Sequence, residues 1–257
     1  MTTPAGFDRV TAGGVVALTR SIARDWVEAT LRNSVTLYDA AVEMSQGAME
    51  GRGVVHVVAA PAREDKQWAV RRYRRGGWAR PLGDRYLRVG HLRPFRELAA
   101  SEAALKSGVP TPIVVCASVY PGGIFYRGDL ITEYVPDSRD LALVLFGGSQ
   151  ETTQGAEFCR VAALTAAGGL ISRMSRAGVR HPDVNAKNIL LHGDPSSPDA
   201  MLLDLDRCVI GEPSTHRSPT AMYRRLERSL VKWEGRTGRR LSEEERQALR
   251  AGWEVGT

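Results

Sequence analysis

Residues 181–188 of the chain read H-P-D-V-N-A-K-N, and this motif is the strongest indication of its fold. It places an aspartate, Asp183, two residues after His181, and an asparagine, Asn188, five residues after Asp183. A second acidic motif, D-L-D at residues 204–206, follows an apolar run. Either pattern alone is common by chance, but their order and separation make the combination specific. Together they predict one site, in which a catalytic loop meets a metal-binding carboxylate.

These residue types suit phosphoryl transfer, which needs a metal-held triphosphate, an oriented hydroxyl and positive charge near the transferred group. We predict that Asp183 accepts the hydroxyl proton and that His181 orients the loop. Asn188 and Asp204 are predicted to bind Mg²⁺, which prefers hard oxygen ligands. The combination is typical of protein-kinase-like phosphotransferases, so ATP and Mg²⁺ are the expected cofactors.

The segments around the loop fit this interpretation. An apolar face over residues 161–174 predicts a helix, and Gly178 ends it. Residues 189–191 and 201–203 read as two strands of a hairpin that holds the loop on one side and the acidic motif on the other. Further helices are predicted over 222–233 and from the capping pair Ser242 and Glu245.

Strand patterns dominate the chain before Pro136, and helical patterns dominate after it. The predicted strands cover residues 54–58, 67–73, 113–119 and 125–135. Pro94 opens a predicted helix that reaches Ser107.

The expected fold class is therefore α+β, a bilobal protein-kinase-like fold in one domain. An antiparallel-sheet N-lobe is expected over 51–135 and a short helical C-lobe over 136–257. Residues 1–50 are expected to form a partly helical N-terminal extension, with helices over about 19–31 and 38–49.

The nucleotide-binding residues are predicted from the N-lobe strands. Arg71 stands where a kinase carries the lysine that holds the α- and β-phosphates, and it keeps the positive charge. Arg72 is the alternative if the strand is shifted by one residue. Glu97 is the expected partner of this cation, with Glu102 as second choice.

Two backbone segments complete the predicted nucleotide site. Gly51, Arg52 and Gly53 could cover the phosphates, although an ordinary hairpin turn explains them nearly as well. Residues from Glu133 to Val135 are the expected hinge, where backbone groups read adenine.

The composition is that of a globular protein, with 43% apolar and 25% charged residues among 257. No apolar run is long enough to span a membrane, and the N-terminus does not resemble a secretory signal, so the expected location is cytoplasmic. The three cysteines are widely spaced and indicate neither disulfides nor a zinc site.

The net charge of +6 arises largely from an arginine cluster between residues 71 and 88, interleaved with aromatic residues. Such a cluster suits an anionic partner: nucleotide phosphates, a phosphorylated substrate, an acidic membrane surface or nucleic acid. The alternative is a solvated edge strand. Candidate substrate contacts are Arg74, Arg75, Arg85 and Lys187.

Several blocks of the chain, between Gly51 and Trp233, resemble the lipopolysaccharide core kinase family. They are residues 71–77 (R-R-Y-R-R-G-G), 83–87 (G-D-R-Y-L), 95–97 (F-R-E), 108–112 (G-V-P-T-P), 126–133 (Y-R-G-D-L-I-T-E), 181–188 and 203–207 (L-D-L-D-R). The resemblance implies a protein-kinase-like fold and transfer of the ATP γ-phosphate to a hydroxyl of a 3-deoxy-D-manno-octulosonic acid (Kdo) residue on a lipid A precursor.

The same resemblance implies where the protein works and what it contacts. The partner would be a lipid-linked anionic sugar at the cytoplasmic face of the inner membrane, with peripheral contact to the membrane surface and no nucleic acid. It also assigns Asp183 as the base, Asn188 and Asp204 as metal ligands, Arg71 as the phosphate-contacting cation and Glu97 as its partner. The oligomeric state is left open.

Other functions remain alternatives at this point. A Ser/Thr protein kinase is disfavoured because Pro182 and Asn185 replace its usual arginine and lysine, and because no A-P-E motif follows Asp206. A small-molecule kinase for aminoglycosides or choline-like alcohols shares the Asp-x-Asn loop. A non-catalytic pseudokinase that binds anionic lipid or RNA is the alternative of another class.

Overall fold

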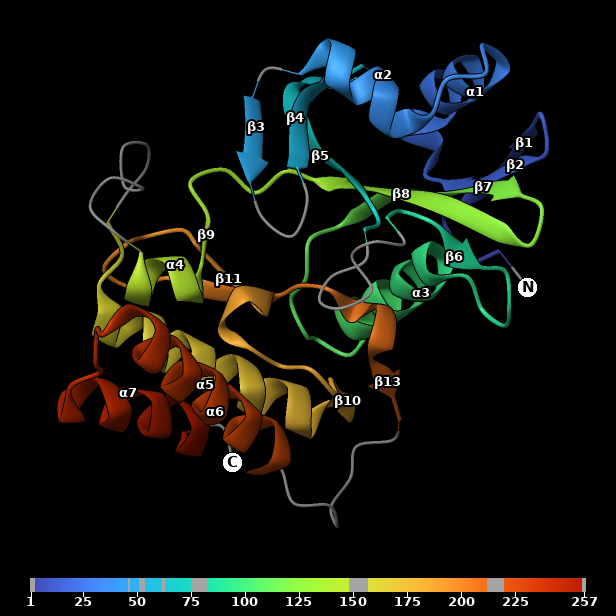
Figure 1. The fold of residues 1–257 in the computed structure, drawn as a ribbon. Helices are drawn as coiled ribbons and strands as arrows, with labels where there is room; N and C mark the ends of the chain where they lie inside the picture. Colours follow the sequence, from blue (N-terminus) through green and yellow to red (C-terminus); the bar gives the residue numbers. More distant parts are fainter. Residues whose placement is uncertain are drawn as a thin grey trace. The chain divides into compact units, whose positions relative to one another are not determined.

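The computed structural model describes residues 3–45, 47–50, 54–61, 63–74, 83–147, 157–211 and 220–255 (Figure 1). The chain divides into two compact units. The first is formed by Met1–Ala99 and Ile113–Tyr134, and the second by Ala100–Pro112 and Val135–Thr257. The chain crosses between the units after Ala99, after Pro112 and after Tyr134, and the last of these points lies within the predicted hinge.

An antiparallel sheet of eight strands forms the framework of the first unit, in the order β1-β2-β7-β8-β5-β4-β3, with β6 paired to β8. The strands are β1 (Asp8–Ala12), β2 (Val15–Thr19), β3 (Gly47–Glu50), β4 (Val54–Ala60), β5 (Arg63–Arg72), β6 (Tyr86–Leu87), β7 (Val114–Gly122) and β8 (Phe125–Glu133). The predicted antiparallel sheet is therefore present.

The N-terminal segment differs from its prediction. Residues 8–19 form the hairpin β1–β2, whose second strand pairs with β7. A short 3-10 helix (η1, Ser21–Ala23) leads into α1 (Arg24–Arg32) and α2 (Leu37–Met44). The predicted helix over 19–31 thus begins later, and the one over 38–49 ends at Met44, because residues 47–50 pair with β4 as β3. The segment set apart as an extension supplies strands of the main sheet.

The two faces of this sheet are covered by different helices (Figure 1). On one face, apolar residues of α1 and α2 pack against Trp68, Val70 and Ile131 of the sheet. On the other, Phe95 and Leu98 of α3 (Arg93–Lys106) pack against strand residues that include Leu130. The predicted helix over 94–107 is confirmed. Successive residues of β5 therefore face different covering layers.

Close approach of α3 to the sheet depends on a glycine in β8. A Cβ added at Gly128 would lie 2.5 Å from Cγ of Pro94 and 3.1 Å from the carbonyl oxygen of Ser118. Any side chain at this position would push the first turn of α3 away from the strand.

Helices form most of the second unit: α4 (Leu141–Phe146), α5 (Arg160–Arg176), α6 (Thr220–Thr237) and α7 (Glu243–Glu254). Three short strands form one sheet, β9 (Arg139–Asp140), β11 (Ile189–His192) and β12 (Asp199–Leu202), while β10 (Val179–Arg180) pairs with β13 (Val209–Ile210). Within the described ranges this unit also contains the 3-10 turns η3 (Ala186–Asn188) and η4 (Leu205–Arg207).

Most sequence predictions for this unit hold. The predicted hairpin is present, with Ile189 opposite Leu202. The predicted capping box is formed: the backbone N–H of Glu245 donates to the Ser242 hydroxyl, and the backbone N–H of Ser242 donates to the Glu245 carboxylate. Among the described residues, none of the helices combines the length and apolarity that crossing a bilayer requires.

Candidate active site

The predicted catalytic loop lies in the second unit between β10 and β11, and His181 is its buried centre. The side chain is only 1% exposed. Its Nδ1 accepts a hydrogen bond from the backbone N–H of Asp183 at 3.0 Å, and its Nε2 lies 2.9 Å from the carbonyl oxygen of Asp204. A backbone N–H can only donate and a carbonyl can only accept, so the two partners select the neutral tautomer with the proton on Nε2. His181 thus links the loop to the acidic motif.

Two asparagine side chains hold the backbone of Asp183. Nδ2 of Asn185 donates to the Asp183 carbonyl oxygen at 2.9 Å, and Nδ2 of Asn188 donates to the same oxygen at 3.2 Å. Asn188 is buried, while Asp183 is exposed. Because Asn188 uses its amide nitrogen here, its Oδ1 is the atom suited to a cation. The Asp183 carboxylate lies where a substrate can reach it.

Asp204 has an unusual backbone, with φ 61° and ψ 58° in the left-handed region. Such a conformation costs a non-glycine residue about 1 kcal/mol or more and therefore has to be held by the surrounding structure. The hydrogen bond from His181 to the Asp204 carbonyl holds it, and Leu203 N–H donates to the Asn188 carbonyl at 2.8 Å. The structure therefore brings the loop and the acidic motif together.

These side chains fit a magnesium ion held mainly by phosphates. Over the ranges that the structure describes, no group of three or more His, Cys, Asp or Glu side chains could hold a metal ion without other ligands. An asparagine oxygen and a carboxylate supply hard oxygen ligands and leave positions for phosphate oxygens, which is the usual coordination of Mg²⁺ with a nucleotide.

In the first unit, Arg71 on β5 forms the predicted ion pair with Glu97 on α3. Nη2 of Arg71 lies 2.5 Å from Oε1 of Glu97, and the Tyr73 hydroxyl donates to Oε2 of the same carboxylate. The Arg71 guanidinium also lies over the Tyr73 ring, 4.8 Å from its centroid. Glu97, rather than Glu102, is thus the partner of Arg71, and it is 4% exposed.

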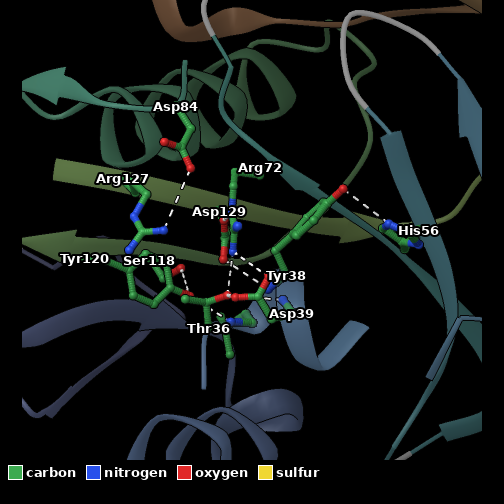
Figure 2. A network of polar contacts seen from close by, with 11 residues as sticks. Thr36, Tyr38, Asp39, His56, Arg72, Asp84, Ser118, Tyr120, Arg127 and Asp129 are labelled. Carbon is green, nitrogen blue, oxygen red and sulfur yellow. Dashed lines mark hydrogen bonds and ion pairs between the residues drawn. The ribbon is translucent and has the colours of Figure 1, made fainter. Parts of the chain in front are cut away.

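Arg72 points to the opposite face of β5 and serves a different purpose. Its Nε lies 3.2 Å from Oδ1 of Asp129, and its Nη2 lies 3.1 Å from Oδ1 of Asp39 and 2.5 Å from Oγ1 of Thr36. The guanidinium also covers the Tyr38 ring at 4.5 Å. Figure 2 shows Arg72 between Asp129 and these residues around the start of α2. Arg71 is therefore the better candidate for phosphate contact.

Sequence reasoning missed the buried polar network around Asp129, whose side chain is fully buried. Its carboxylate accepts a hydrogen bond from the backbone N–H of Tyr38 at 3.0 Å. The Tyr120 hydroxyl accepts from Leu37 N–H at 2.8 Å and from Ser118 at 2.9 Å (Figure 2). The network ties the first turn of α2 to β7 and β8.

Burial raises the pKa of the Asp129 carboxyl above its usual value of 3.8, because desolvation of the carboxylate outweighs the attraction of Arg72. Burial acts to lower the pKa of Arg72, but Asp129 and Asp39 together raise it. The sequence signal was an acid in the middle of a predicted strand, followed by Leu130 and Ile131, because a carboxylate that such a strand buries needs a cation as partner.

The remaining predicted residues have the following positions. Glu133 forms an ion pair with Lys66 at 2.8 Å, and Val135 is half-buried at the start of the second unit. Arg74 and Arg85 are exposed. Nζ of Lys187 lies over the Trp233 ring, 5.3 Å from its centroid. Gly51, Arg52, Gly53 and Arg75 lie outside the described residues.

Comparison with known proteins agrees with these observations. The model of the lipopolysaccharide kinase (Kdo/WaaP) family matches residues 42–253. The 3-deoxy-D-manno-octulosonic acid kinase of Haemophilus influenzae (strain ATCC 51907 / DSM 11121 / KW20 / Rd) is 30% identical over 204 residues, covering 77% of this chain and 80% of that protein. The protein of the same name from Xanthomonas oryzae pv. oryzae (strain PXO99A) is 36% identical over 188 residues, covering 72% and 69%.

A solved structure described as "WaaP in complex with acyl carrier protein" has a similar fold. It superposes with a TM-score of 0.53 at 15% identity and covers 96% of this chain and 89% of that one. At this identity the similarity concerns the fold alone, and the predicted α+β, protein-kinase-like class is confirmed.

Proposed function

Because this chain belongs to the lipopolysaccharide kinase (Kdo/WaaP) family and is a kinase of lipopolysaccharide core biosynthesis, we propose that it transfers the γ-phosphate of ATP to a hydroxyl of a Kdo sugar on a lipid A precursor. The observation that carries the choice of acceptor is the match, over most of the chain, to curated relatives that bear the name of a Kdo kinase. The geometry of the catalytic loop supports the reaction type.

The transfer step uses the exposed carboxylate of Asp183. The carboxylate accepts the proton of the sugar hydroxyl as the hydroxyl oxygen forms a bond to the γ-phosphorus. The bond from that phosphorus to the β–γ bridging oxygen breaks, and ADP leaves. His181, Asn185 and Asn188 hold the Asp183 backbone, so the carboxylate meets the hydroxyl in a fixed position.

Asn188 and Asp204 are the proposed ligands of Mg²⁺. When bound, the ion neutralises phosphate charge and orients the γ-phosphate. The hydrogen bond from His181 fixes the backbone of Asp204, and Leu203 N–H fixes that of Asn188, so both ligands are positioned before the nucleotide arrives.

Arg71 is proposed to hold the α- and β-phosphates, with Glu97 and Tyr73 fixing its guanidinium. The fork of an arginine can bind phosphate oxygens through two N–H groups. Backbone groups between Glu133 and Val135 are proposed to bind adenine, and Gly51, Arg52 and Gly53 to cover the phosphates.

The acceptor in this proposal is lipid-linked and anionic, so the protein would work as a peripheral protein on the cytoplasmic face of the inner membrane. Arg74, Arg75, Arg85 and Lys187 are the proposed contacts to its acidic groups. Two of these cations, Arg74 and Arg85, are exposed in the first unit, which supports contact with a large anionic ligand.

Mass spectrometry of the acceptor tests the proposal. Kdo-bearing lipid A precursor, dispersed in detergent, is incubated with the protein, ATP and Mg²⁺, and an aminoglycoside and a generic protein substrate are incubated in parallel. We expect the lipid to gain one phosphate, located on the Kdo residue by fragmentation. An unchanged lipid, together with phosphate on the antibiotic or on the protein, would assign this chain to a rival kinase class.

A further inference from the structure

One edge of the first unit exposes apolar side chains that lie close together. Leu87, Val89 and Ile124 are 52%, 79% and 69% exposed. Leu87 is opposite Phe125 in the β6–β8 ladder, and Arg88 N–H donates to the Ile124 carbonyl at 2.9 Å. The segment 87–89 thus runs directly beside the turn between β7 and β8. Single exposed apolar residues are ordinary, but a cluster at one edge marks a binding surface.

A groove of about 450 Å³ is lined in part by Arg88, which lies between Leu87 and Val89 of this cluster. Its walls are largely apolar and come from β2, β7, the start of α3 and the segment before it. The apolar wall residues are Val16, Leu18, Leu92, Phe95 and Val119. A groove of this size can take part of a small ligand or of a lipid chain.

The charged residues that line the groove are two arginines. Arg9, Arg88 and His91 line it and are exposed, and none of the described lining residues is acidic. Arginines beside an exposed apolar surface are the combination that binds anionic lipids, because the cations meet lipid phosphates while the apolar groups enter the acyl region.

We propose that this edge, formed by Leu87, Val89, Ile124 and the adjacent groove, docks the protein on the anionic surface of a phospholipid bilayer. The three apolar side chains enter the interface, Arg9 and Arg88 contact lipid phosphates, and the groove receives part of an acyl chain. The inference rests on the proposed function in one respect, since a lipid-linked acceptor is reached at a membrane.

Vesicle sedimentation of the full chain tests this inference. Neither nucleotide nor sugar acceptor is present, so a failure to bind vesicles is distinct from a failure of phosphate transfer. Vesicles of phosphatidylcholine are compared with vesicles that also contain phosphatidylglycerol. We expect binding to the anionic vesicles that weakens as salt is raised.

Two variants locate the surface. Leu87→Ser/Val89→Ser/Ile124→Ser should weaken binding about tenfold or more, because the apolar contribution to interfacial binding is lost. Arg9→Gln/Arg88→Gln should weaken binding to anionic vesicles about tenfold, because the contacts to lipid phosphates are lost. Circular dichroism and thermal unfolding check that each variant is folded.

Matched control variants carry the same kinds of substitution at exposed residues outside the proposed edge. Ile22→Ser/Val42→Ser/Val231→Ser replaces three exposed apolar residues on η1, α2 and α6, and Arg224→Gln/Arg228→Gln removes two exposed arginines from α6. Both should bind vesicles like the unchanged protein.

Three results would overturn the inference: no binding of the unchanged protein to anionic vesicles, full binding by both test variants, or equal loss in the controls. Light scattering tests the alternative that a second copy of this chain occupies the edge. If the unchanged protein is a dimer and the apolar triple variant is a monomer, a second copy of the chain, not a bilayer, covers this edge.

Discussion

Arg71 and Arg72 are adjacent residues on β5 that face opposite sides of the sheet. Arg71 pairs with Glu97 on the side covered by α3, and Arg72 pairs with Asp129 on the side covered by α1 and α2. Successive side chains of a strand point to opposite faces of the sheet. This separates Arg71, which is proposed for nucleotide binding, from Arg72, which stabilises the fold.

Loss of Arg72 should affect stability. Arg72→Met leaves the fully buried Asp129 carboxylate without its cation, and we expect the free energy of unfolding to fall by about 3–5 kcal/mol in urea denaturation. Asp129→Leu in the same chain should recover part of the loss. The exposed pair of Arg63 and Asp65 provides the control, and Arg63→Met should leave the urea midpoint unchanged. A double variant no more stable than Arg72→Met would contradict this account of the pair.

Loss of Arg71 should affect transfer. Arg71→Met removes the proposed phosphate contact, and kcat/KM for ATP should fall about a hundredfold or more. Arg71→Lys keeps the charge that pairs with Glu97 but not the fork of the guanidinium, and it should recover part of the activity. Steady-state kinetics at varied ATP measures both, with Arg63→Met as control. Equal activity of Arg71→Met and the unchanged protein would exclude Arg71 from the nucleotide site.

At the scale of elements, α7 packs backbone against backbone on α5, the helix that leads into the catalytic loop. A Cβ added at Gly252 would lie 2.1 Å from the Thr165 carbonyl oxygen, and one at Gly168 would lie 2.2 Å from that of Leu249. Glycine at both positions is therefore required for the helices to approach this closely.

The alanine variants of two helical glycines should have opposite effects. Gly252→Ala forces α7 away from α5 and should lower the free energy of unfolding by about 3 kcal/mol. Gly235→Ala in α6 has nothing within 4 Å and should raise it by up to about 1 kcal/mol, because alanine has the higher helix propensity. Thermal and urea denaturation compare the two. A stable Gly252→Ala protein would show that the helices separate without cost.

The capping box of α7 should make the second unit sensitive to acid. Burial acts to raise the pKa of Glu245, but hydrogen bonds from Arg160 and from the Ser242 backbone lower it below the usual 4.5. A lowered carboxyl pKa in the folded state stabilises the protein above pH 4.5, and this stabilisation is lost as the pH falls through the folded-state value. Urea midpoints measured downward from neutral pH should fall below pH 4.5. Glu245→Gln should show a smaller fall, and an identical pH profile would contradict the assignment.

Local patterns predicted some elements well and failed where pairing is distant along the chain. The hairpin of β11 and β12 was predictable because its strands are apolar and joined by a short polar turn. The hairpin of β1 and β2 had a weaker signal, Gly13-Gly14 between the mixed run D-R-V-T-A and the apolar-rich run V-V-A-L-T. The two glycines have φ 54° and 81°. The sequence analysis did not predict this hairpin. The pairing of its second strand with β7 joins residues about a hundred positions apart, which no local pattern indicates.

The same distinction holds for the candidate site. Order and spacing predicted His181, Asp183, Asn188 and Asp204, and the structure joins their segments through the His181 and Leu203 hydrogen bonds. The Asp129 network was not predicted, because its members come from α2, β5, β7 and β8 and meet only through the sheet. A catalytic motif can be predicted from the order and spacing of its residues in the sequence. A polar network whose members meet only through packing of the sheet cannot.

At the scale of the whole molecule, the chain combines one unit that carries the Arg71–Glu97 pair with another that carries the catalytic loop and the acidic motif. Residues 8–44 belong to the first unit as a hairpin and a helical layer over the sheet. The family match begins only at residue 42, so this layer lies almost entirely outside the matched region while its apolar residues form part of the sheet's core.

In the proposed reaction, transfer depends on the Asp183 carboxylate, which accepts the proton of the sugar hydroxyl. The most direct measurement takes Asp183→Asn, with Asp199→Asn as a control at an exposed strand residue, and determines ATP affinity and single-turnover phosphate transfer to the Kdo-bearing lipid for each. We predict unchanged ATP affinity and transfer slowed by about 10²–10⁴-fold in Asp183→Asn only. Transfer at the unchanged rate by a folded Asp183→Asn protein would contradict the claim.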